Sequence, residues 1–97
     1  MNETFTWENS SKYERDWFMR TAFESNVLDP STSVDDALKL IPTDWEIQLT
    51  KFPGFPVDPW EAIVSVPTKC GSFRSVSQTP SDAICRALLM AKGYDVE

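Results

Sequence analysis

The chain has 97 residues, of which 41% are apolar and 12% aromatic, so it is long and apolar enough to fold as one domain over residues 1–97. Fifteen acidic residues outweigh nine basic ones and give a net charge of −6. Histidine, the commonest general base and zinc ligand, does not occur, and neither does a glycine-rich phosphate loop or a G-x-S-x-G motif. We therefore expect no enzyme, no metal and no cofactor.

The first part of the chain predicts an extended arm followed by a helix. Residues 1–10 form the arm, either a short strand or an extended lead, in which Phe5 and Trp7 alternate with polar neighbours and offer their rings to the core. Serine and asparagine residues then supply caps for a helix over residues 11–24. Its apolar residues recur at helical spacing and are Tyr13, Trp17, Phe18, Ala22 and Phe23.

The middle of the chain predicts a short helix and then strands. Ser33 caps the helix, whose apolar side is formed by Val34, Ala37, Leu38 and Ile41, and Pro42 ends it. Apolar and polar residues alternate from residue 45 to residue 50 and again from 60 to 66, which indicates two half-buried strands. The intervening KFPGFPVDP is an ordered loop, and residues 73–78 predict a third strand.

The last helix carries the strongest signals. Thr79 is its cap, Pro80 occupies the first helical position, and Gly93 is placed to end it. The element order is α-α-β-β-β-α, and short connections make the strands an antiparallel meander. We expect an α+β fold, an α/β sandwich in which helices cover a three-stranded sheet. The predicted core comprises Trp45, Ile47, Leu49, Val64, Ile84 and Leu88.

The cellular setting follows from segments that the sequence lacks. No apolar run approaches the ~20 residues needed to span a bilayer, and the first residues have no signal-peptide pattern, so we expect a cytoplasmic protein. The two cysteines, Cys70 and Cys85, are interpreted as packing residues rather than a disulfide.

Two stretches resemble a known family. Residues 31–49, STSVDDALKLIPTDWEIQL, run from a short helix through a proline to an aromatic strand start, and residues 77–93, SQTPSDAICRALLMAKG, form the threonine-proline entry and apolar face of a helix. In both, the chain resembles short phage and prophage proteins of the phage ABA sandwich domain family. The resemblance implies a phage origin and an infected bacterial host, and it assigns no functional residue.

The acidic residues concentrate between residues 29 and 61, which hold seven acids and two lysines. A rigid surface of carboxylates could imitate the phosphates of nucleic acid, although the same charge could serve only solubility. Aromatic rings in the proline-rich loop offer a second kind of contact. The predicted partner-binding residues are Asp29, Asp35, Asp36, Asp44, Glu46, Asp58, Glu61, Phe52 and Phe55.

Two functions fit these features. The first is a phage-encoded inhibitor of the anti-CRISPR type, an acidic DNA mimic that blocks a basic nucleic-acid-binding host complex such as a CRISPR effector. The alternative is a structural or accessory phage protein that mediates protein assembly. In either case we expect a monomer that binds neither nucleic acid nor membrane directly.

Overall fold

A computed structural model describes residues 7, 10–52, 59–67 and 72–94. The elements are α1 (Lys12–Phe23), α2 (Val34–Lys39), β1 (Glu46–Lys51), β2 (Trp60–Ser65), β3 (Ser72–Ser77) and α3 (Pro80–Lys92). The predicted α+β class and element order are confirmed. The predictions for Phe5, for the loop around Phe55 and Asp58, and for Cys70 lie outside the described residues.

Side-chain caps begin the helices where the sequence predicts them. Ser11, Ser33 and Thr79 each accept a hydrogen bond from a backbone N–H in the first turn of their helix. Gly93 ends α3 with a φ of 97°, in the left-handed region that glycine adopts without strain. Glu24 ends α1 in the same region, at φ 50°, although it carries a side chain. None of these helices is long and apolar enough to cross a membrane.

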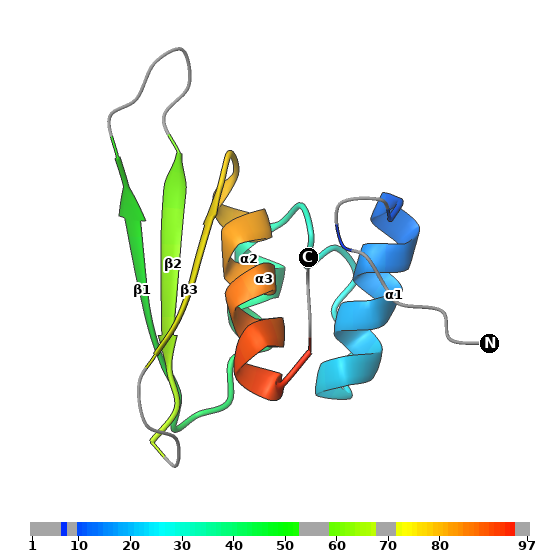
Figure 1. Ribbon diagram of the computed structural model, residues 1–97. Helices are drawn as coiled ribbons and strands as arrows, with labels where there is room; N and C mark the ends of the chain where they lie inside the picture. The colour runs from blue at the N-terminus through cyan, green and yellow to red at the C-terminus, as the bar shows by residue number, and fades with distance from the viewer. Residues whose placement is uncertain (1–6, 8–9, 53–58, 68–71, 95–97) are drawn as a thin grey trace, which may run out of the picture.

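The strands form one antiparallel sheet in the order β1-β2-β3. Leu49 of β1 lies opposite Ala62, and Ile63 lies opposite Arg74 of β3. Because side chains alternate along a strand, Leu49 and Ala62 belong to one face and Ile63 and Arg74 to the other. Figure 1 shows all three helices on one side of the sheet, so the face with Ile63 and Arg74 is open in the described part of the chain.

Helix α3 is the centre of the molecule. It packs against β2 and β3 on one side and against α1 and α2 on the other, and in Figure 1 it stands between the sheet and α1. A helix enclosed on both sides must be apolar nearly all round. The residues of α3 that are at most 1% exposed are Ala83, Ile84, Cys85, Ala87, Leu88, Leu89 and Ala91.

The predicted core is confirmed, with a difference between the strands. Val64 of β2 is fully buried, as are Ile84 and Leu88, whereas Trp45 and, in β1, Ile47 and Leu49 are only half-buried and pack against the core. The reason is position, because β1 is the outermost strand and α3 lies against β2 and β3.

Helix α1 presents a different side to the core than the sequence suggested. Tyr13 and Trp17, assigned to its apolar set, are 85% and 60% exposed. The buried side consists of Asp16, Met19 and Ala22, with Phe18 and Phe23 half-buried beside it. In α2, similarly, Leu38 is exposed and Ala37 is buried. The carboxylate of Asp16 can be buried on this side because it accepts a hydrogen bond from the backbone N–H of Ser31 at 2.9 Å.

Trp7 lies in the core, as predicted for its ring. It is 1% exposed, and its indole Nε1 donates a hydrogen bond to the carboxylate of Asp82 in the first turn of α3. Arg15 Nε donates to the Trp7 carbonyl at 2.8 Å, and the guanidinium lies 5.1 Å from the centre of the Trp7 ring. Trp7 therefore contacts both α1 and α3.

Candidate functional site

Two of the predicted acidic residues stabilise the turn that leads into α2. Lys12 Nζ donates to Asp29 Oδ1 at 2.5 Å, and the backbone N–H of Asp29 donates to Asp36 Oδ2 at 2.9 Å. Asp36 also lies 3.8 Å from Lys39 Nζ. These two carboxylates are thus already engaged within the chain.

Lys12 also pairs with the buried carboxylate of Asp16, at 2.7 Å. Burial alone would raise the pKa of Asp16, but the hydrogen bonds from Lys12 and Ser31 outweigh it and hold that pKa below its ordinary value. The pKa of Lys12 is raised mainly by its hydrogen bond to Asp16 and next by its hydrogen bond to Asp29. Lys12 and Asp16 therefore keep their charges at neutral pH, and the cluster ties α1 to the segment before α2.

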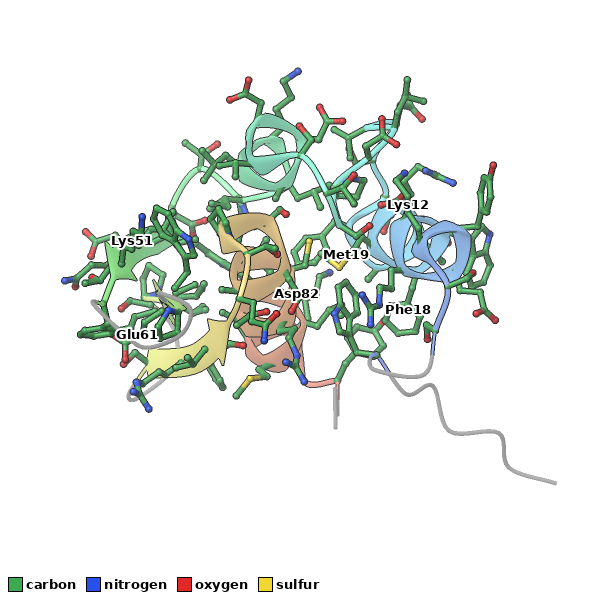
Figure 2. The ribbon with its side chains drawn as sticks, turned by 90° about the horizontal axis from the view of Figure 1, so that it is seen from above. Lys12, Phe18, Met19, Lys51, Glu61 and Asp82 are labelled. Carbon is green, nitrogen blue, oxygen red and sulfur yellow. The ribbon has the colours of Figure 1, made fainter. Side chains whose placement is uncertain are left out.

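Glu61 belongs to the open face of the sheet but is not a free carboxylate. It is 8% exposed, and it forms an ion pair with Arg74 of the neighbouring strand β3. Figure 2, which labels Glu61, shows the sheet and α2 as separate parts of the molecule. The predicted acidic segment is therefore divided between two regions rather than gathered on one.

Three predicted acidic residues remain exposed. Asp35 lies in the first turn of α2, Asp44 precedes β1, and Glu46 is the first residue of β1. Phe52, immediately after β1, is 39% exposed. These side chains are available to a partner, whereas Phe55 and Asp58 are outside the described residues.

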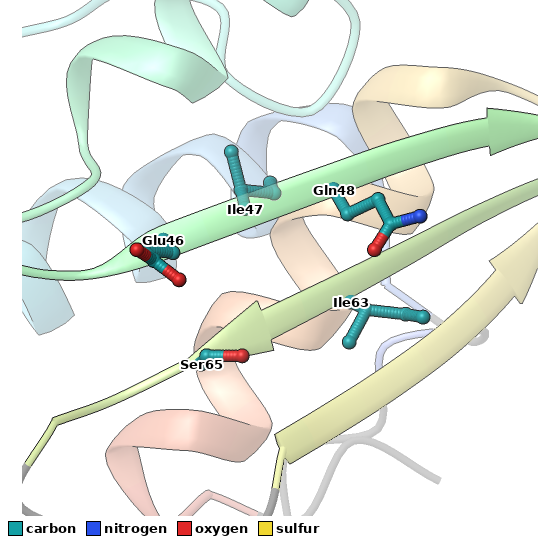
Figure 3. Close-up of a pocket in the computed structure, with 5 residues that line it drawn as sticks. All are labelled: Glu46, Ile47, Gln48, Ile63 and Ser65. Atoms are coloured by element: carbon teal, nitrogen blue, oxygen red, sulfur yellow. The ribbon is translucent and has the colours of Figure 1, made fainter.

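The open face of the sheet contains a shallow depression of about 490 Å³. Figure 3 shows its lining on the adjacent strands β1 and β2, where Glu46 lies opposite Ser65 and, further along, Gln48 lies opposite Ile63. Ile47 and Ile63 add apolar side chains to a lining whose other residues are polar. A shallow, mixed surface of this kind fits a contact with another protein better than an enclosed small molecule.

The outer side of α1 is a surface that the sequence reasoning missed. One side of the helix carries Tyr13, Trp17, Thr21 and Glu24, a set that we call the aromatic stripe. Its two rings lie one helical turn apart, and Glu14, also exposed, borders it. A signal for it exists in the sequence, since Tyr13 and Trp17 fall on a different side of a helix from Ala22 and Phe23. Rings around so much of the circumference cannot all face one core.

The cysteine in the described part of the chain, Cys85, is buried. Burial, followed by the charges of Asp82 and Asp16, raises the pKa of the Cys85 thiol well above its ordinary value, so this thiol stays protonated. Among the described residues, no three acidic or cysteine side chains are close enough together to hold a metal ion.

Comparison of the chain with protein-family models, with curated protein sequences and with solved structures finds no match. The resemblance to the phage ABA sandwich domain family therefore stays a prediction.

Proposed function

We propose that this protein is an inhibitor that occupies a basic, nucleic-acid-binding surface of a bacterial defence complex, in the cytoplasm of an infected host. It acts by occupancy rather than turnover. The observation that carries the proposal is the aromatic stripe, in which two large exposed rings accompany exposed carboxylates on one rigid helix. An acidic chain whose exposed Tyr13 and Trp17 rings can anchor an interface suits a basic partner.

The rings and the acidic residues have different tasks in this proposal. Tyrosine and tryptophan dominate the binding energy of protein interfaces, where truncating a central ring costs roughly 2 kcal/mol or more. An exposed ion pair contributes only about 0.2 to 1 kcal/mol, but several carboxylates steer a basic partner and disfavour an acidic one. We therefore assign affinity to Tyr13 and Trp17, and salt dependence to the exposed carboxylates, including Asp35, Asp44 and Glu46.

Competition for labelled DNA tests the proposal. The protein is titrated into CRISPR effector complexes bound to fluorescent DNA, and DNA release is followed by anisotropy at several salt concentrations. We expect stoichiometric release that weakens as salt rises. W17A should raise the concentration needed at least tenfold. The matched control is L28A, since Leu28 is 72% exposed and lies outside the helices.

A charge-reversal pair separates a local acidic surface from net charge. The first variant carries D35K, D44K and E46K. The second makes the same charge change at acidic residues outside the described part, Glu3, Glu8 and Asp95. Glu14 is unsuitable as a control because its carboxylate accepts a hydrogen bond from the Ser11 N–H in the cap of α1. If both variants lost the ability to release DNA equally, net charge alone would account for the effect of the acidic surface. If the wild-type protein released DNA from no effector, the inhibitor proposal would be contradicted.

A second function is that of a phage assembly or accessory protein. The same exposed rings favour it if they alone, without the carboxylates, provide the contact. Apolar anchoring would make binding to another phage protein nearly independent of salt, whereas the inhibitor should weaken with salt. Salt dependence of the captured complex therefore distinguishes the two.

A further inference from the structure

Strand β1 is an edge of the sheet, and its outward backbone groups can be identified. The N–H of Phe52 donates to the carbonyl of Pro59 at 2.9 Å, so this pair is hydrogen-bonded across β1 and β2. In an antiparallel ladder such pairs alternate with pairs that do not bond. The N–H and C=O groups of Ile47 and Leu49 consequently point away from β2, and no described residue bonds to them.

Between its charged end residues, Glu46 and Lys51, strand β1 carries no feature that protects this edge. Natural edge strands are usually interrupted by proline, by a bulge or by an inward charge, because a bare edge invites another strand. The segment EIQLTK contains no proline or glycine and pairs with β2 without a bulge. Ile47 and Leu49 are only half-buried on the helix side. A further strand beside β1 would pair its free backbone groups and cover these side chains.

We propose that the strand beside β1 is β1 of a second copy of this chain. Antiparallel strands related by a two-fold axis require that facing residues belong to the same face of the sheet. A two-fold axis at Gln48 meets this condition and gives a continuous sheet of both copies. Ile47 then faces Leu49 of the second copy, and Glu46 faces Thr50 of the second copy, with roughly four backbone hydrogen bonds in the centre.

The charges along β1 permit this register. Glu46 faces a neutral residue, and the two Glu46 carboxylates lie four residues apart along the strands, about 13 Å, beyond the Debye length of about 8 Å at physiological salt. An axis at Leu49 would instead place Lys51 of the second copy opposite Ile47, which the axis at Gln48 avoids. One strand pair is a small contact, typical of transient complexes below about 1,200 Å², so we expect a weak dimer that forms at high protein concentration. This inference stands independently of the proposed inhibitor function and replaces the expected monomer.

Sedimentation of the purified chain from about 5 to 500 µM tests the dimer. Gln48 is exposed on the open face, so Q48K and Q48E leave the core intact, which circular dichroism checks. Each variant alone sets like charges together at the axis and should weaken dimerisation at least tenfold. An equimolar mixture sets lysine against glutamate and should recover the wild-type dimer or exceed it. The controls are S72K and S72E, at an exposed position on β3 at the far edge of the sheet.

The outcomes are distinct. Loss in each single variant with recovery in the mixture supports the β1 dimer. A monomer at all concentrations overturns it, as does a dimer that tolerates both single variants or one that the mixture fails to restore. A dimer abolished by W17A but not by Q48K would place the second copy on the aromatic stripe and would also overturn the proposal.

Discussion

Replacing Glu24 by glycine should stabilise the protein, because this residue ends α1 with a φ of 50° and a ψ of 51°. A side chain in the left-handed region costs roughly 1–2 kcal/mol, whereas glycine there costs nothing. The greater freedom of glycine in the unfolded chain offsets about 0.5–1 kcal/mol of this gain. We expect the free energy of unfolding to rise by about 0.5–1 kcal/mol, or roughly 2–8 °C in Tm for a chain of 97 residues.

Urea unfolding followed by circular dichroism measures this change, with E24Q as the matched control. Glutamine keeps the strained side chain but removes a negative charge from the C-terminal end of a helix, where it is unfavourable by about 0.3–1 kcal/mol. The excess stability of E24G over E24Q therefore isolates the backbone strain. If E24G were no more stable than E24Q, the strain at Glu24 would be refuted.

Three further changes test the core and the charge cluster. L88A removes a fully buried side chain from the central helix and should lower the free energy of unfolding in urea by about 2–5 kcal/mol; a loss below 1 kcal/mol would contradict the burial. Because the folded pKa of Asp16 lies below its unfolded value of 3.8, the stability from its pairing with Lys12 is present above pH 3.8 and lost as pH falls through the folded pKa. Stability curves of wild type and D16N should accordingly converge in acid and separate at neutral pH, and a constant difference would argue against the pairing. In a C70S variant, Cys85 should resist iodoacetamide until urea unfolds the chain, whereas equal rates in both states would show that the thiol is accessible.

Much of the fold could be predicted because its signals are local. The cap at Thr79 and the glycine at Gly93 predict both ends of α3 to within a residue, and the alternation around Ile47 predicts β1. The faces of the helices were harder. The burial of Asp16 depends on Ser31, fifteen residues away, and periodicity alone does not reveal such a partner.

The acidic residues illustrate why a site is harder to predict than a fold. Composition located a surplus of acids between residues 29 and 61, but their availability depends on partners distant in sequence. Arg74 neutralises Glu61 from the neighbouring strand, and Lys12 of α1 reaches Asp29 in the turn before α2. Asp35 stays exposed on α2. The aromatic stripe, conversely, required knowing which side of α1 faces α3.

The central position of α3 constrains how the chain acquires its structure during synthesis. Helix α1 and the sheet emerge from the ribosome before α3, yet α3 separates them and supplies contacts to both. Trp7 cannot reach its hydrogen-bond acceptor until Asp82, 75 residues later, has been made. The sheet would meanwhile expose the apolar face that α3 covers, including Val64, to other chains. We therefore expect the chain to fold cooperatively only after α3 has emerged, and slowly, because its contacts are long-range. Nascent chains arrested before Thr79 should be sensitive to protease.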